Sequence, residues 1–321
     1  MNRVTGLKPA PIILLLFLVS GCMRKAFFQL HVAVFLAGFT GVLGRLISFN
    51  EAMIVWYRLL IASVTMWILY GLRKKIRRID ISDTLAICIT GFIAAMHWVT
   101  FYGSIKYANV SVALVCFSSV GFFTSLFEPI VVKKAPDPGE ILLGLLTLCG
   151  VLVIFHLDTQ FKTGILLGLA SAMLGALFPI FNRQFLRRIN VETLLAWEIT
   201  GGFISLSLLL PLYLRHFPVS HFLPGLEDLA WLLVLAWLCS VVAFEFTLNA
   251  LKRLSAFTVN LTFNLEPVYG ILLAFLVFKE NKMLGMGFYI GFSIIAIALI
   301  IHAWMVKRQA ARLRAGPAPI F

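Results

Sequence analysis

Long apolar runs alternate with short polar segments along almost the whole chain. Ten of these runs are long enough to cross about 30 Å of hydrocarbon as an α-helix, which rises about 1.5 Å per residue. They lie at residues 30–48, 52–71, 84–105, 110–132, 141–157, 164–182, 193–214, 229–249, 256–278 and 284–305. Each run is continuous apolar sequence, whereas a membrane barrel strand alternates over about ten residues. The pattern therefore predicts an all-α integral membrane protein with ten transmembrane helices.

Two pairs of residues recur at an offset of 141 positions. They are Glu51 and Trp56, which return as Glu192 and Trp197, and Gly144 and Gly150, which return as Gly285 and Gly291. Five apolar runs separate a feature from its copy, so each copy enters the membrane from the opposite side. Such inverted five-helix repeats build a central cavity with alternating access to the two faces of the membrane.

The repeat divides the chain into four predicted parts. These are an N-terminal extension at 1–29, a first five-helix repeat at 30–157, a second at 164–305, and a basic tail at 306–321.

Composition and charge agree with a membrane protein. Hydrophobic residues make up 61% of the chain and charged residues only 13%, which excludes an ordinary soluble domain. With the N-terminus inside, the segments on the cytoplasmic side hold eighteen Lys and Arg residues and the outer loops hold five. Both termini are therefore predicted to be cytoplasmic. The net charge of +13 is explained by this topology, so no nucleic-acid partner is expected.

The first 22 residues match no part of the repeat. A basic start, an apolar run and Cys22 resemble a bacterial lipoprotein signal. Lipidation would hold Cys22 outside, whereas Arg24 and Lys25 predict that this end lies inside. We therefore expect either translation from Met23 instead of Met1 or an additional short hydrophobic segment, and lipidation is the less favoured alternative.

Motifs of catalysis and of metal binding are absent from the sequence. The cysteines form no C-x-x-C pair, the six histidines show no metal spacing such as H-x3-H, and neither G-x-S-x-G nor H-E-x-x-H occurs. We therefore expect no enzyme activity, no catalytic residues, no metal and no cofactor.

Charged and polar groups within the spans are the candidate site, because an ionisable group at depth costs several kcal/mol unless it faces a partner or a wet cavity. Arg58, His97, Glu198 and Glu266 lie well inside their runs. Two hypotheses remain for Arg58 and Glu198. Either they form a structural salt bridge between the halves, or Arg58 binds an anionic substrate group while Glu198 takes protons or substrate amines. We favour the second.

The ninth apolar run carries unusual polar side chains. Asn260 and Asn264 are one turn apart on one face, and Glu266 lies roughly opposite. Pro267 cannot donate a backbone hydrogen bond, which leaves an acceptor free and permits a kink. We expect a gate or binding helix, and a kink that serves only packing is the open alternative.

Four further residues are secondary candidates: Trp56, Tyr102, Trp197 and Glu245. The aromatic rings could stack on a substrate, although aromatic residues in spans also fill core and interface positions. Glu245 lies nearer the end of its span, where interfacial anchoring is the alternative.

Several segments together carry a family resemblance. In chain order they are Gly38, Gly41 and Gly44, then Trp56-Tyr57-Arg58, the segment Phe101 to Tyr107, the segment Leu251 to Ala256, and Glu266-Pro267 followed by Phe278-Lys279-Glu280. Their order and the doubled halves resemble an EamA-type member of the drug/metabolite transporter superfamily. The N-terminal extension and the Pro-rich link from Lys133 to Glu140 depart from that pattern.

The resemblance implies a ten-helix carrier of the inner membrane for small metabolites, often an exporter of amino acids or related compounds, with no bound cofactor. We therefore expect a secondary transporter that works by alternating access. A flippase for lipid-linked substrates and a non-transporting scaffold are the alternatives; a scaffold leaves the intramembrane Glu residues unexplained. The expected partners are a small-molecule metabolite and the lipid bilayer, and two copies could also form a homodimer.

Overall fold

The computed structural model describes residues 12–251, 262–263 and 265–315. All regular elements in these ranges are helical, which confirms the predicted all-α class. The α-helices are α1 (Ile12–Leu46), α2 (Glu51–Leu72), α3 (Ile81–Tyr107), α4 (Val110–Phe117), α5 (Val120–Val132), α6 (Pro138–Leu157), α7 (Lys162–Phe185), α8 (Val191–His216), α9 (Leu226–Ala236), α10 (Ala243–Leu251), α12 (Glu266–Phe278) and α13 (Met286–Ala315). A π-helix, η2 (Trp237–Val242), joins α9 to α10, and short 3-10 turns precede α7 and α13.

Eight helices of the described chain are long and apolar enough to cross a membrane. They correspond to the first eight predicted spans. Two shorter apolar helices, Glu266–Phe278 and Met286–Ile301, occupy the positions of the ninth and tenth. The chain is therefore a multi-pass membrane protein, and ten complete spans stay a prediction.

Local sequence explains where the helices begin and end. Asn50 and Asn109 accept hydrogen bonds from the backbone N–H groups three residues later and so cap α2 and α4. Pro138 opens α6, where its missing N–H costs nothing. At the other end, α5 and α12 both stop at a lysine in the left-handed region, Lys133 and Lys279, each with φ of 56°.

Two predicted spans are not continuous α-helices. The fourth breaks between α4 and α5, where the Ser118 hydroxyl donates to the Leu114 carbonyl (3.1 Å) and the Ser119 hydroxyl to the Cys116 carbonyl (2.6 Å). These side-chain bonds compete with the helical ladder. The eighth span widens into the π-helix η2. The spans predicted at 110–132 and 229–249 are confirmed as the membrane-span candidates Val110–Val132 and Leu226–Ala250. The irregular backbone within them was not predicted, because hydropathy does not register local backbone hydrogen bonding.

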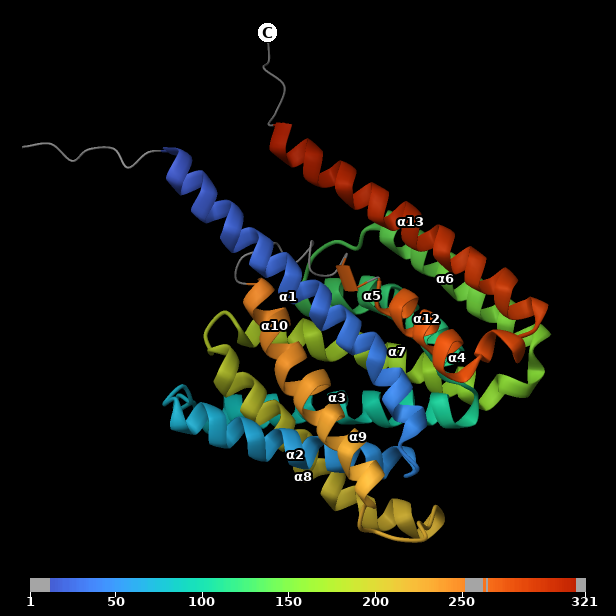
Figure 1. Cartoon of the computed structure of the whole chain (residues 1–321). Coiled ribbons are helices and arrows are strands. Elements are labelled where there is room, and N and C mark those ends of the chain that lie inside the picture. Colours follow the sequence, from blue (N-terminus) through green and yellow to red (C-terminus); the bar gives the residue numbers. More distant parts are fainter. Residues whose placement is uncertain (1–11, 252–261, 264, 316–321) are drawn as a thin grey trace, which may run out of the picture.

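The helices pack in a pattern that relates the two halves. Helix α3 of the first half contacts α7 and α8 of the second half. Helix α1 contacts α9, α10 and α12, and α2 contacts α9. Helix α2 also packs along α8, and α6 along α13. Figure 1 shows α6 and α13 together at one edge of the molecule, with α2, α3 and α8 at the opposite side. The core therefore lies mainly between helices of different halves.

Candidate functional site

Arg58 of α2 lies buried at the centre of the packed helices, with 3% of its surface exposed. Its Nε donates to the Ser240 hydroxyl at 2.8 Å, and its Nη1 donates to the Tyr102 hydroxyl at 3.0 Å. Its Nη2 donates to the Cys239 carbonyl at 3.3 Å. The guanidinium also lies 4.3 Å from the centre of the Trp98 ring, a cation–π contact. Arg58 is therefore held by two other elements, η2 and α3.

The π-helix explains how Arg58 is held. Both Cys239 and Ser240 belong to η2, and the Ser240 hydroxyl also contacts the Leu235 carbonyl five residues earlier at 3.2 Å. A π-turn inserts an extra residue into the helical ladder and is frequent at functional sites. Sequence reasoning missed Cys239 and Ser240 because neither residue type marks a π-turn.

The partners that hold the Arg58 guanidinium are neutral. Within the described ranges no carboxylate lies within ion-pair distance of it. The three hydrogen bonds engage three of the five N–H donors of the side chain. A buried cation held by dipoles and by an aromatic face retains its attraction for an anion. The site can therefore accept a carboxylate or a similar group.

Glu266 is the acidic group associated with this centre. It is half-buried as the first residue of α12, and its carboxyl lies within electrostatic range of Arg58. Helix α12 begins at Glu266 after a turn at Leu265, and Pro267 is its second residue. Pro267 thus opens a helix, as proline commonly does. Asn260 and Asn264, the other candidates of this run, lie outside the described residues.

His97 of α3 is buried one residue before Trp98. Its Nδ1 lies 2.9 Å from both the backbone carbonyl and the hydroxyl of Ser171 on α7. The Ser171 hydroxyl also donates to the His97 carbonyl at 3.1 Å. Rings of Phe117 and Phe178 lie within 6 Å of the imidazole. These contacts give His97 a role in joining α3 to α7, beside the Arg58 centre.

Glu198 of α8 is buried, with 4% of its surface exposed. Both of its carboxylate oxygens accept hydrogen bonds from the Asn182 amide of α7, at 3.0 and 2.9 Å. The structure does not form the Arg58–Glu198 salt bridge that was one of the two hypotheses. The two charged groups instead occupy separate polar sites, and Glu198 has no cationic partner within the described part of the chain.

The secondary candidates are distributed over different regions. Tyr102 belongs to the Arg58 centre. The Trp56 indole donates to the Ser207 hydroxyl on α8 at 2.9 Å. Trp197 meets Trp67 edge to face, with ring centres 5.2 Å apart, and Glu245 of α10 lies half-buried in electrostatic range of Tyr70. Only Tyr102 among these four contacts Arg58.

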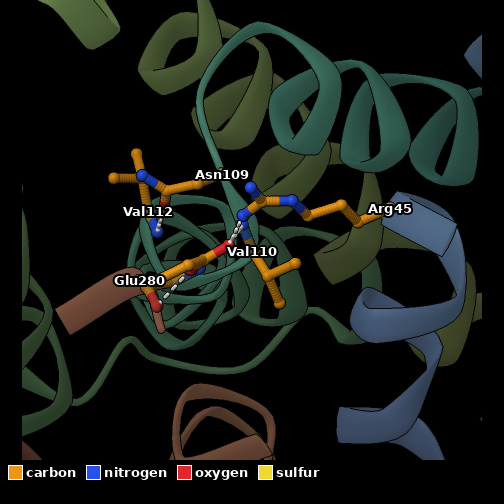
Figure 2. A network of polar contacts seen from close by, with 6 residues as sticks. Arg45, Asn109, Val110, Val112 and Glu280 are labelled. Atoms are coloured by element: carbon orange, nitrogen blue, oxygen red, sulfur yellow. Dashed lines mark hydrogen bonds and ion pairs between the residues drawn. The ribbon is translucent and has the colours of Figure 1, made fainter. Parts of the chain in front are cut away.

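A second polar network lies at the start of α4 (Figure 2). Glu280 is fully buried, and its carboxylate accepts hydrogen bonds from the Val110 N–H at 3.1 Å and the Ser111 N–H at 2.9 Å. The Ser111 hydroxyl donates to it at 2.6 Å, and Arg45 of α1 forms an ion pair with it. A carboxylate at a helix N-terminus is favoured by the helix dipole. Sequence reasoning quoted Glu280 only as part of a motif and missed this role.

No group of three or more His, Cys, Asp or Glu side chains suited to a metal ion occurs in the ranges that the structure describes. The arrangement places buried hydrogen-bonding and charged groups within a helical membrane protein.

Comparison with known proteins decides the family. The sequence pattern of the EamA-like transporter family matches residues 24–156 and again residues 162–302, which together are most of the chain. The chain belongs to the EamA-like transporter family. The pattern matches each half separately, so the repeat inferred from Glu51 and Glu192 corresponds to two copies of the EamA-like unit.

Among the relatives of this EamA-like chain are two bacterial proteins. The uncharacterized transporter YdfC of Bacillus subtilis is 23% identical over 57% of this chain, and the match spans 61% of the length of YdfC. An uncharacterized transporter of Haemophilus influenzae is 24% identical over 70% of this chain and 74% of its own length. One solved crystal structure superposes with a TM-score of 0.61 at 15% identity, covering 89% of this chain and 99% of its own. That likeness shows a shared fold. Transporters of this kind are typically not enzymes.

Proposed function

We propose that this chain is a secondary transporter that moves a small metabolite with a carboxylate group through the site around Arg58, by alternating access. The observation that carries the proposal is the buried Arg58 guanidinium, which is held by a hydroxyl pair, a carbonyl and an aromatic ring. An ionisable group at this depth is costly and marks a substrate or ion pathway. A carboxylate would complete the coordination of the guanidinium.

Amino acids or related compounds fit this arrangement best. Arg58 would bind the substrate carboxylate through its remaining N–H donors, with Glu266 within electrostatic range to attract an ammonium group. Trp98 and Tyr102 would exclude water from the bound group. Glu198, in its separate site with Asn182, would take and release protons as the coupling group.

Alternating access rests on the proposed inversion of ten spans. The Tyr213 hydroxyl at the end of α8 donates to Glu51 at the start of α2, at 2.5 Å. Lys75, beyond the end of α2, pairs with Glu192 at the start of α8, at 2.9 Å. Glu51 and Glu192 are repeat equivalents, so an antiparallel arrangement of α2 and α8 supports inversion. The proposed cavity lies at the interface of the two halves.

Export across the bacterial inner membrane is the proposed direction and place. The excess of Lys and Arg in the segments that hold Lys75 and Arg188 supports an orientation with both termini in the cytoplasm. A small metabolite and the bilayer remain the proposed partners, with a homodimer as an additional arrangement.

The test compares metabolites in the medium and the cytoplasm of cells that overproduce the wild-type chain or the double variant Arg58→Gln, Glu266→Gln at equal membrane abundance. We expect an amino acid or related carboxylate to accumulate outside only with the wild-type chain. Equal accumulation with both chains would remove Arg58 and Glu266 from the transport site. Enrichment of a lipid-linked compound would favour a flippase, and no difference across the panel would favour import or a scaffold.

A further inference from the structure

A second cavity, of about 320 Å³, lies away from Arg58, between the end of α2, the segment that follows it, the start of α3 and α8. We call it the basic cavity. Trp67 and Trp197 form an aromatic wall, and the Trp67 indole is fixed by a hydrogen bond to the Thr200 hydroxyl at 2.8 Å. Arg77 and Arg78 line the cavity as well. Its volume suits a small organic molecule.

The cations around the basic cavity differ in whether they have an acidic partner. Two of the neighbouring cations are paired: Lys75 with Glu192 at 2.9 Å, and Arg188 with Asp83 at 2.5 Å. In the described part of the chain, no carboxylate forms an ion pair with Arg77 or Arg78. Two guanidinium groups beside two indole rings therefore remain available to an anion.

The segment that carries these arginines is held in place. The Arg77 N–H donates to the Thr193 hydroxyl at 2.8 Å, and the Asn190 amide donates to the Lys75 carbonyl at 2.9 Å. Both partners belong to the start of α8 or the turn before it. The backbone of the segment is therefore pinned against the other half of the molecule, and the arginines are presented from a fixed position.

The opposite end of the molecule provides an internal comparison. A cavity of about 360 Å³ there is lined by the segment Pro218–His221, together with Glu51 and Lys106. Pro218 and Val219 stand 141 positions after Arg77 and Arg78, which is the repeat offset. The two cavities are thus built by equivalent segments. Only the basic cavity has an arginine pair, whereas the other carries one charge of each sign.

We propose that the basic cavity is a binding site for an organic anion with an aromatic or apolar body, with the anionic group on Arg77 and Arg78 and the body against Trp67 and Trp197. Arginine binds carboxylate and phosphate through paired N–H donors, and indole rings pack on planar or apolar groups. A free aromatic carboxylate and the headgroup region of an anionic phospholipid share this chemistry. The basic cavity would be a second anion site in addition to the one proposed at Arg58. This inference does not depend on the transport proposal, so either can be correct without the other.

The experiment uses the purified full chain in nanodiscs of phosphatidylcholine, with para-fluorobenzoate as the probe and fluorine NMR as the readout. The neutral para-fluorobenzamide is the control ligand. The test variant is Arg77→Gln, Arg78→Gln. The matched control is Arg73→Gln, Arg187→Gln, which removes the same charge from exposed residues that do not line the cavity.

We expect the Arg77, Arg78 variant to bind the benzoate about tenfold more weakly, as expected for loss of a charged hydrogen-bonding pair, and the control variant to bind as the wild type does. Benzamide should bind equally weakly to all three. The variant Arg77→Lys, Arg78→Lys should retain part of the affinity, because it keeps the charge. Equal loss in both Gln variants would mean general surface charge and would overturn the proposal.

Two further arms separate this site from others. If Arg58→Gln alone removed all benzoate binding, the anion would lie at Arg58 and the proposal would be wrong; retained binding supports it even when transport is lost. Wild-type chain in nanodiscs containing phosphatidylglycerol identifies the source. Displacement of benzoate by that lipid assigns the site to a headgroup, and undiminished binding assigns it to a free anion.

Discussion

Gly150 of α6 and Gly291 of α13, which lie 141 positions apart in the sequence, pack directly against each other. A Cβ atom added to Gly150 would lie 2.7 Å from the Gly291 carbonyl oxygen, and one added to Gly291 would lie 2.4 Å from the Gly150 carbonyl oxygen. Two repeat-equivalent residues therefore contact each other through their own backbones. This close approach is what small residues permit between membrane helices. The glycine faces of these two helices are thus used within one chain, so a homodimer would need other surfaces.

Alanine at these two glycines is expected to lower the stability of the protein. The variant Gly150→Ala, Gly291→Ala must push α6 and α13 apart, and overpacking of this kind costs about 1–3 kcal/mol. Gly71→Ala is the matched control, since no atom lies within 4 Å of an added Cβ there. Thermal unfolding in detergent should show a lower midpoint for the double variant and an unchanged or higher midpoint for the control. Equal midpoints would contradict the contact.

The sequence predicted the helical membrane class and the burial of Arg58 and Glu198. Both predictions need only the hydropathy of a run and the position of a residue within it, and not the identity of the neighbouring helices. It did not predict the π-turn that supplies Ser240, or the cap that Glu280 places on α4. Those features depend on which helix lies opposite, and no local pattern records that. The same reason explains why Arg58 and Glu198, at nearly equivalent repeat positions, have different partners.

Replacement of Ser240 by Ala should weaken transport without unfolding the chain. It removes the hydrogen bond from the Arg58 Nε at 2.8 Å, and such a bond to a charged group contributes about 1.5–3 kcal/mol. Cys239→Ala is the control, because Arg58 uses the backbone carbonyl of that residue and the substitution keeps it. The efflux rate of the compound identified by metabolite comparison should fall about tenfold or more in Ser240→Ala only. Equal efflux rates in the two variants would mean that the Ser240 hydroxyl of η2 does not position Arg58 for transport.

Arg58→Lys should lose most of the transport even though the charge is kept. The ammonium group cannot reproduce the planar fork that contacts η2 and Tyr102 while it presents further donors to a carboxylate. The apparent affinity for the substrate should weaken in the same efflux assay. Wild-type affinity in Arg58→Lys would mean that a point charge is enough, and the proposed paired binding of the carboxylate would have to be abandoned.

Loss of the Glu280 carboxylate should destabilise the region around α4. Glu280→Gln places an amide where the N–H groups of Val110 and Ser111 point, and it removes the ion pair with Arg45. Breaking a buried charged network of this type costs about 3–5 kcal/mol. Glu227→Gln, at an exposed position near the same end of the molecule, serves as the control. The midpoint of thermal unfolding should fall for Glu280→Gln and remain unchanged for Glu227→Gln. A fall of the same size in both variants would indicate a general charge effect.

Proton coupling through Glu198 makes a prediction that separates it from substrate binding. The carboxylate is bound by the Asn182 amide and has no cationic partner in the described chain, so it can change charge without breaking an ion pair. In proteoliposomes, an imposed pH gradient should accelerate uptake of the identified substrate by the wild-type protein. Glu198→Gln should still exchange substrate down its own gradient but should not respond to pH. Asn182→Ala, which keeps the carboxylate, should retain a response. If the wild-type rate is indifferent to the gradient, Glu198 is a packing residue and transport is facilitated exchange through the Arg58 site.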